Sequence, residues 1–137
     1  MTLVLDSSAT LASVYPDEIT AAIQLVMDEV VRNGAWVPAI WRLEVANALE
    51  MAVRKGRTDI AFRDATLSDL NLLRIYVDTE TNGQAWGVTL RLAELHRLTL
   101  YDASYLEVAI RRNLPLATLD SELRTAAAAE KVVLLGV

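Results

Sequence analysis

Leu100-Tyr101-Asp102-Ala103-Ser104-Tyr105 and Pro115-Leu116-Ala117-Thr118-Leu119-Asp120 are the two stretches that decide the predicted fold of this chain. The first predicts the beginning of a helix with an acid in its first turn, and the second predicts a short apolar strand that ends at an acid. A similar strand occurs near the N-terminus, where Leu3-Val4-Leu5 runs into Asp6-Ser7-Ser8. The sequence therefore predicts two strands that end in an aspartate, together with a third aspartate at a helix start.

An aspartate at the start of a helix has an ordinary structural explanation. Its carboxylate can cap the helix by accepting hydrogen bonds from the unpaired N–H groups of the first turn. Thr99 and Asp102 have the three-residue spacing of a capping box, in which a hydroxyl and a carboxylate satisfy each other's backbone donors. The sequence alone leaves open whether Asp102 is a structural cap or a functional acid.

Short strands alternate with helices along the whole chain. The apolar runs predict strands at residues 3–5, 35–37, 75–77, 115–118 and 131–135. Helices are predicted at 7–14, 18–32 (capped by Asp17), 39–55 (opened by Pro38), 59–73, 83–95, from about 102 onward, and at 120–130. This order predicts βαβ units, so we expect a three-layer α/β/α sandwich with a mostly parallel central sheet, built as one domain over residues 1–137.

The composition limits the class of protein. The chain is 53% hydrophobic and 23% charged, as in a globular domain, and it has no cysteine for disulfides or thiolate metal sites. No apolar run reaches the ~20 residues that a membrane helix requires, and the N-terminus lacks the basic segment of a signal peptide. We therefore expect a soluble, cytoplasmic protein that does not enter a membrane.

The net charge of −5 argues against a surface covered with phosphate contacts, because these require an excess of Lys and Arg. The acidic excess is concentrated in a few positions. When Asp6, Glu44, Asp102 and Asp120 are set aside from the 18 acidic residues, the remainder nearly balances the 13 basic residues. If these four acids hold cations, the rest of the surface is close to neutral.

These four acids are predicted to meet at one edge of the sheet. Asp6 and Asp120 follow strands, and ligands of open parallel sheets bind beyond the carboxyl ends of the strands. A helix that begins on the same edge would add Asp102. Glu44 could reach in from the helix at 39–55, although an acid on a helix is ordinarily a solvated surface residue. Four nearby carboxylates repel one another, so the cluster is costly unless a cation neutralises it.

The available ligands indicate which cation would bind. Oxygen donors without cysteine, and with a single histidine, favour Mg²⁺ or Mn²⁺ over zinc. Such ions support phosphate chemistry by activating water and by stabilising the leaving oxygen. Ser8, Asn47 and Thr118 are small polar residues near the predicted ligands, and we expect them to orient ligands or waters.

Four motifs of this chain resemble those of PIN domains and, more narrowly, those of the VapC-type toxins of bacterial toxin–antitoxin pairs. The motifs are Leu5-Asp6-Ser7-Ser8, Pro38-x-x-Trp41-x-x-Glu44-Val45-Ala46-Asn47-Ala48-Leu49, Leu98-Thr99-Leu100-Tyr101-Asp102-Ala103-Ser104-Tyr105 and Leu116-Ala117-Thr118-Leu119-Asp120. Each motif is weak alone, but all four occur in the family's order. The resemblance covers essentially the whole chain, and no acidic position departs from the family pattern.

The resemblance implies a Mg²⁺- or Mn²⁺-dependent endoribonuclease. Asp6, Glu44, Asp102 and Asp120 would carry the metal, and Ser8, Asn47 and Thr118 would support them. It also implies an RNA substrate, a cognate antitoxin that occupies the site, and assembly as a homodimer or as a toxin–antitoxin hetero-oligomer. The region 56–80 has no motif of its own, and we expect it to form part of the antitoxin or dimer surface.

Other families that gather acids at strand ends fit less well. A receiver-type phosphoacceptor needs a lysine at the end of a late strand, whereas Lys131 precedes the last predicted strand. A haloacid-dehalogenase-type phosphatase needs Asp-x-Asp, whereas the residue two beyond Asp6 is Ser8. The five glycines fit no nucleotide-binding loop. The remaining alternative is a PIN-like module that binds RNA or protein without cutting it.

One histidine and three tryptophans are predicted to be structural. His96 has no accompanying nucleophile such as cysteine. We expect Trp36, Trp41 and Trp86 in the core or an interface rather than stacked on bases, because no basic residues interleave with them.

Overall fold

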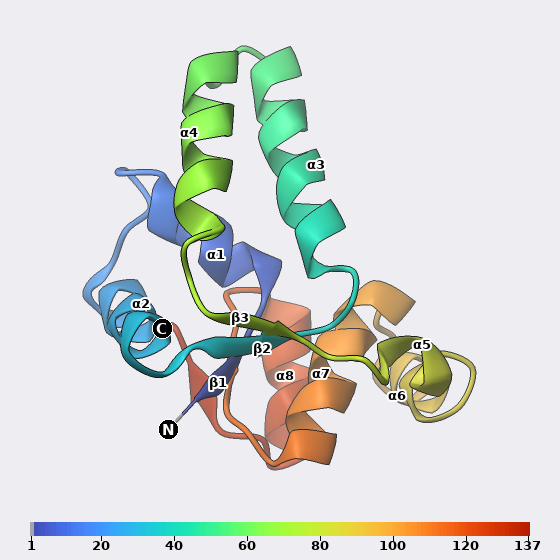
Figure 1. The fold of residues 1–137 in the computed structure, drawn as a ribbon. Helices are drawn as coiled ribbons and strands as arrows, with labels where there is room; N and C mark the ends of the chain where they lie inside the picture. The colour runs from blue at the N-terminus through green and yellow to red at the C-terminus, as the bar shows by residue number, and fades with distance from the viewer. Residues whose placement is uncertain (1) are drawn as a thin grey trace.

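The computed structural model describes residues 2–137 (Figure 1). Its strands are β1 (Leu3–Leu5), β2 (Ala35–Val37), β3 (Ile75–Val77), β4 (Leu116–Ala117) and β5 (Leu134–Leu135). Its helices are α1 (Ser7–Val14), α2 (Ala21–Asn33), α3 (Trp41–Arg54), α4 (Ile60–Leu70), α5 (Thr81–Gln84), α6 (Val88–His96), α7 (Leu100–Arg112) and α8 (Ser121–Ala129).

All described strand pairs are parallel, in the order β3-β2-β1-β4-β5. β1 is the central strand and its three residues are fully buried, which explains its uninterrupted apolar sequence. Helices α7 and α8 lie on one side of the sheet, and α1, α3 and α4 lie on the other (Figure 1). The predicted α/β/α sandwich with a parallel sheet is confirmed.

The turn between α2 and β2 requires a glycine. Gly34 has φ +77°, and its N–H donates to the carbonyl of Val30 at 2.8 Å, which closes α2. A Cβ at this position would lie 2.7 Å from the Arg74 carbonyl oxygen and 2.8 Å from the Tyr76 ring. The predicted end of this helix is therefore confirmed and has a steric cause.

The start of α2 differs from the prediction that Asp17 caps it. The cap is Thr20, whose hydroxyl accepts a hydrogen bond from the Ile23 N–H at 3.1 Å. Residues 15–18 instead form a turn in which the Glu18 N–H donates to the Tyr15 carbonyl. Asp17 thus precedes the helix by a full turn.

Other boundaries also differ from the sequence prediction. The helix expected at 83–95 is two helices, α5 and α6, because the backbone leaves helical geometry at Gly87, where α6 begins. Pro38 lies in a turn before α3, with its carbonyl accepting from the Trp41 N–H. β5 begins at Leu134 rather than at 131, because Lys131 adopts φ +60° and the Val132 N–H still bonds back to α8.

A buried ion network, which the sequence analysis did not single out, fastens the end of α7 beneath β3. The Asp78 carboxylate is fully buried and accepts hydrogen bonds from Arg111 at 2.8 Å and Arg112 at 2.9 Å. Burial favours its neutral form, but these hydrogen bonds and that from Thr81 outweigh burial and lower the pKa of Asp78 to about 2. A charge buried in this way depends on both arginines.

The tryptophans and the histidine are only partly as predicted. Trp41 is buried and its indole N–H donates to Thr10, whereas Trp86 is 92% exposed and is not a core residue. Trp36 is half-buried and the Arg112 guanidinium lies 3.4 Å from its ring centroid, so a basic residue does stack on it. His96 has a structural contact, because its Nε2 lies 2.7 Å from Glu130 and links α6 to the end of α8.

Across residues 2–137, the helices are all too short or too polar to cross a membrane.

Gly34→Ala should destabilise the fold by more than about 1 kcal/mol, because alanine disfavours the left-handed backbone and its Cβ would clash with backbone. Urea unfolding measures this loss. Gly83→Ala is the matched control, since a Cβ at Gly83 meets nothing within 4 Å and lies in a helix. Equal stability of the two variants would show that the Gly34 geometry imposes no cost.

Candidate active site

The predicted acids lie on neighbouring elements at the carboxyl edge of the sheet. Asp6 directly follows β1, and Asp120 follows β4, which pairs with β1. Glu44 and Asp102 lie in the first turns of α3 and α7. The topology therefore brings the four acids of four separate motifs toward one region, and their role as one site stays a prediction.

Asp6 is the most buried of the four, with 3% of its surface exposed. Its Oδ2 accepts hydrogen bonds from the Ser8 hydroxyl at 2.6 Å and from the Thr118 hydroxyl at 2.7 Å. Burial raises the pKa of Asp6 above its ordinary value, and the two hydroxyl hydrogen bonds partly offset this effect. Asp6 occupies the N-cap position of α1, yet its side chain makes no capping hydrogen bond, so a capping role does not explain the acid.

Ser8 and Thr118 connect Asp6 to the loop that carries Asp120. The Ser8 hydroxyl oxygen accepts from the Leu119 N–H at 3.0 Å, and the Thr118 hydroxyl oxygen accepts from the Asp120 N–H at 3.1 Å. Both residues therefore hold the ends of β1 and β4 in a fixed relation. This geometry supports the role predicted for Ser8 and Thr118, which is to orient the ligands of the site.

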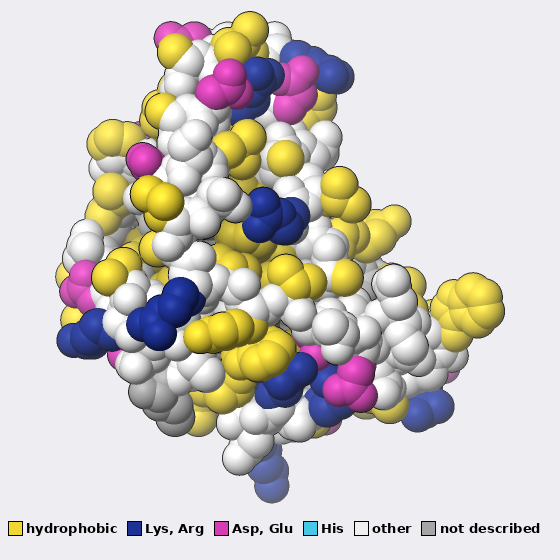
Figure 2. All heavy atoms as spheres, in the orientation of Figure 1, with side chains coloured by type: hydrophobic (Ala, Val, Ile, Leu, Met, Phe, Trp, Pro, Cys, Tyr) yellow, Lys and Arg dark blue, Asp and Glu magenta, His cyan; other side chains and the backbone are white. Residues whose placement is uncertain are grey.

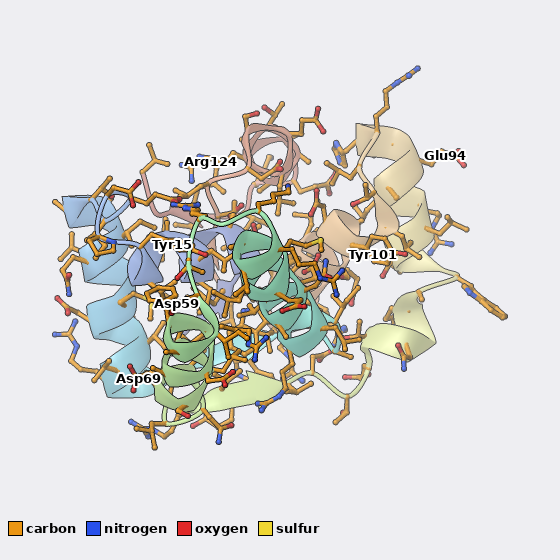
Figure 3. The ribbon with its side chains drawn as sticks, turned by 90° about the horizontal axis from the view of Figure 1, so that it is seen from above. Tyr15, Asp59, Asp69, Glu94, Tyr101 and Arg124 are labelled. Atoms are coloured by element: carbon orange, nitrogen blue, oxygen red, sulfur yellow. The ribbon has the colours of Figure 1, made fainter. Side chains whose placement is uncertain are left out.

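The guanidinium of Arg124 also fixes the end of β4. Arg124 on α8 (Figure 3) donates to the carbonyl oxygens of Thr118 at 2.8 Å and Leu135 at 3.0 Å. These carbonyls belong to the ends of neighbouring strands, so the arginine satisfies acceptors at the carboxyl edge of the sheet.

The role of Asp102 is not that of the helix cap. Thr99 caps α7, and its hydroxyl accepts from the Asp102 N–H at 3.1 Å. The Asp102 carboxyl is half-buried, and burial together with the negative charges of the other acids raises its pKa to about 6, with Asp6 and Asp120 the strongest neighbours. The four acids therefore share one electrostatic field, in which the negative charges of Asp6, Glu44 and Asp120 disfavour ionisation of Asp102.

Asp120 and Glu44 each accept a hydrogen bond from a group of the fold. Asp120 caps α8, because its Oδ1 accepts from the Leu123 N–H at 2.8 Å. Glu44 is half-buried, and its Oε1 accepts from the Tyr105 hydroxyl at 2.5 Å. Burial is the main cause that raises the pKa of Glu44.

Tyr105 is a site residue that the sequence analysis did not assign. It is fully buried, and burial and the nearby carboxylates raise the pKa of its phenol, so the hydroxyl remains a donor to Glu44. The sequence held a signal for it, because Tyr105 lies three residues after Asp102 and so shares a face of α7 with that acid.

Asn47 is not brought into this hydrogen-bond network. It is exposed on α3, and within residues 2–137 its side chain makes no hydrogen bond. Its predicted role in orienting ligands or waters stays a prediction.

The chemistry of the donor set suits a hard divalent cation, because it consists of carboxylates supported by hydroxyls. Their mutual repulsion, visible in the raised pKa of Asp102, is what a bound cation would relieve. In the part of the chain that the structure describes, however, no three acidic or histidine side chains converge closely enough to enclose an ion. The residues present therefore suit Mg²⁺ or Mn²⁺ in their chemistry, but their side chains are not assembled into a metal site in this structure.

A groove of about 550 Å³ runs along α1 and α3, and Asp120 is the one of the four acids that lines it. Ser8 and Asp120 line one end, and Lys55 and Arg57 line the other. The guanidinium of Arg57 lies over the ring of Tyr15 and pairs with Glu18. The groove thus runs from Asp120 to two cationic side chains, one of which is paired with Glu18 in the same lining.

A family model described as the PIN domain matches residues 3–129. The chain belongs to the PIN-domain family. PIN domains are generally nucleases, which fits acids gathered at one edge of a parallel sheet. The comparison with curated proteins gives no match.

Three solved structures show the same fold. PAE2754 from Pyrobaculum aerophilum is 26% identical with a TM-score of 0.70, over 98% of this chain and 83% of that chain. FitAcB from Neisseria gonorrhoeae is 17% identical with a TM-score of 0.67, over 98% and 96%. VapBC2 from Rickettsia felis, bound to a DNA fragment from its promoter, is 14% identical with a TM-score of 0.65, over 98% and 97%. The predicted family is confirmed, and these structures are similar to the PIN domain described above.

The raised pKa of Asp102 predicts a pH dependence of stability in chelator. Because the folded chain binds this proton more tightly than the unfolded chain, the stability that it contributes is lost as pH rises from about 4 through about 6. Asp102→Asn removes this loss, so its melting temperature at pH 7 should exceed that of the parent, with a flatter dependence between pH 4 and 7. The Asp78 network does not interfere, since its pKa of about 2 places its effect below pH 4.

Asp69→Asn is the matched control, because Asp69 is an exposed acid on α4 (Figure 3) and also loses one charge. Thermal melts of the three proteins across this range provide the measurement. An Asp102→Asn variant that melts like Asp69→Asn, or below it, would contradict the shared field.

Proposed function

We propose that this PIN domain is a metal-dependent endoribonuclease that hydrolyses RNA phosphodiester bonds, and that it acts as the toxin of a toxin–antitoxin pair. The observation that carries the proposal is the shared field of Asp6, Glu44, Asp102 and Asp120 at the edge of a PIN-type sheet. The whole chain acts as one catalytic domain, and the cytoplasm supplies both RNA and Mg²⁺.

The four acids would hold Mg²⁺, or Mn²⁺ in its place. When bound, the ion supplies an activated water and stabilises charge on the phosphate oxygens. Ser8 and Thr118 fix the orientation of the Asp6 carboxylate, and Tyr105 fixes that of Glu44. Preset orientation lowers the cost of assembling the site around its ligand.

The groove beside the acids supports a strand of nucleic acid as substrate. Lys55 is exposed at the end of the groove away from Asp120 and can contact a backbone phosphate, whereas the charge of Arg57 is paired with Asp17 and Glu18. The net charge of −5 restricts such contacts to a few positions, as expected for a nuclease with a narrow track rather than a broad basic face.

The pair of helices α3 and α4 supports an antitoxin partner. They project beyond the sheet as a hairpin (Figure 1), and hydrophobic side chains gather in the furrow between them (Figure 2). This furrow is lined by Val45, Leu67 and Leu70, among others, and also by Arg42, which donates to Asn71 at 3.1 Å. An apolar segment of the antitoxin, or a second copy of the chain, would bury this surface.

The alternative is a catalytically silent module that binds RNA or protein. The exposed apolar furrow between α3 and α4 favours this reading as much as it favours a toxin. The two functions differ in their response to chelator: a silent module keeps its affinity for RNA, and a nuclease loses its activity.

Purified protein should cut a pool of structured and single-stranded RNAs in Mn²⁺ or Mg²⁺, and cutting should stop in chelator. Asp102→Asn should reduce the rate by at least about a hundredfold, as expected when a group at the reacting centre is lost. The Asp69→Asn variant should cut like the parent. Gel analysis of labelled RNA gives the rates.

The thermal shift on adding Mn²⁺ separates the remaining outcomes. A rise in melting temperature that Asp102→Asn weakens indicates that these acids bind the ion. Binding of RNA without cutting, with no response to millimolar Mn²⁺, would replace the nuclease with the silent module.

A further inference from the structure

The peptide group that joins Thr118 to Leu119 is held from both sides. Its carbonyl oxygen accepts a hydrogen bond from Arg124 Nη1 at 2.8 Å, and its N–H donates to the Ser8 hydroxyl oxygen at 3.0 Å. The peptide group is trans and planar, so its C=O and N–H point in opposite directions, and fixing one of them fixes the other. Arg124 therefore determines the direction from which the Leu119 N–H approaches Ser8.

The Ser8 hydroxyl passes this constraint on to Asp6. A hydroxyl has one hydrogen to donate and two lone pairs that accept. Since one lone pair of Ser8 accepts from the Leu119 N–H, its hydrogen is free to donate to Asp6 Oδ2, 2.6 Å away. The Thr118 hydroxyl is arranged in the same way, because it accepts from the Asp120 N–H and donates to the same carboxylate oxygen. The backbone after β4 thus directs two hydroxyl groups at one buried acid.

The partners of Arg124 are backbone carbonyls rather than acids. The same Nη1 donates to the Leu135 carbonyl oxygen at 3.0 Å, and that oxygen also accepts from the Thr118 N–H at 3.3 Å. Within residues 2–137 the guanidinium forms no ion pair with a carboxylate. Ion pairing therefore does not account for this arginine, whereas the two carbonyls at the ends of β4 and β5 do.

We propose that Arg124 is a positioning residue of the nuclease site: it fixes the Thr118–Leu119 peptide group and, through Ser8, orients the Asp6 carboxylate. The inference rests on the proposed ribonuclease function and adds to it a residue outside the acids and their hydroxyl partners. Groups that orient a metal ligand from behind change metal affinity or activity by about ten- to a hundredfold when they are removed. An arginine that served only the stability of the fold would leave both unchanged.

Two substitutions of Arg124 test this role. Arg124→Met keeps most of the length of the side chain but removes its donors. The Mn²⁺ concentration that gives half of the thermal shift should then rise roughly tenfold, and kcat for RNA cleavage should fall by a similar factor with KM little changed. Arg124→Lys should recover part of both losses, since an ammonium group can still donate to the Thr118 carbonyl.

Arg74→Met is the matched control. Arg74 also donates to a backbone carbonyl, that of Arg32 at 2.6 Å, but it precedes the edge strand β3, at the end of the sheet away from the acids. Its substitution should lower the melting temperature without changing the Mn²⁺ midpoint or kcat. A control that shifted the Mn²⁺ midpoint as far as Arg124→Met does would attribute the effect to lost stability and overturn the positioning role.

A double-mutant cycle with Ser8→Ala tests the path between Arg124 and Asp6. Ser8→Ala removes the hydroxyl that links the peptide group to the carboxylate. In this background Arg124→Met should change the Mn²⁺ midpoint by less than about twofold, because the connection is already broken, whereas independent residues give the same factor in both backgrounds. Equal factors would overturn the connection through Ser8.

Amide hydrogen exchange gives a readout without metal or RNA. In chelator, the Leu119 amide of Arg124→Met should exchange roughly tenfold faster than that of the parent, as expected when the bond that fixes its peptide group is lost. The rate is compared with that of the Val4 amide, which donates to the Pro115 carbonyl within the sheet and reports opening of the whole fold.

The combined results separate the two hypotheses. Unchanged exchange at Leu119, or an unchanged Mn²⁺ midpoint in Arg124→Met, would overturn the positioning role and leave the nuclease intact. A parent that neither responds to Mn²⁺ nor cuts RNA would overturn the proposed function, and the exchange rates would still decide whether Arg124 holds the peptide group.

Discussion

The Asp6 carboxylate follows β1, the central and fully buried strand, and the arrangement of the site depends on how its charge is accommodated. A buried charge without partners costs several kcal/mol or more, so the fold must supply hydrogen bonds or a cation. Ser8 and Thr118 supply two hydroxyls, and these same hydroxyls bond to the backbone of the loop before α8. The two hydroxyls that stabilise the Asp6 carboxylate therefore also fix the loop that carries Asp120.

The other two acids lie in the first turns of α3 and α7, and the far end of α7 is fastened to β3. α7 carries Asp102 at its start, and at its end Arg111 and Arg112 are held by the buried Asp78. α3 carries Glu44, which the Tyr105 hydroxyl on α7 holds at 2.5 Å. Because a helix is rigid, anchoring the far end of α7 fixes the position of Asp102, and the hydrogen bond from Tyr105 relates Glu44 on α3 to the same helix. The negative charges of the four acids still repel one another, and this repulsion contributes to the raised pKa of Asp102.

Prediction from sequence succeeded for features that a short stretch of the chain specifies. It failed for features that depend on contacts between residues far apart in the chain. The strand-then-acid patterns at Asp6 and Asp120, and the helix that carries Glu44, were placed correctly because alternation of apolar runs and helices is visible in short windows. Helix starts were less reliable: the cap of α2 is Thr20 rather than Asp17, and the break at Gly87 divides one predicted helix into two. Trp86 was expected in the core or in an interface, and at 92% exposure it is not a core residue, since apolar character alone does not determine burial.

The sequence by itself determined the fold class, the family and the four acids in their order. These follow from periodicity and from residue types at fixed spacings, which are properties of the chain alone. Only the tertiary structure decided that Tyr105 holds Glu44 and that Asp78 anchors α7. Tyr105 and Glu44 are 61 residues apart, and Arg111 and Asp78 are 33 apart. Contacts of this kind arise from packing between elements, and no local pattern of sequence encodes them.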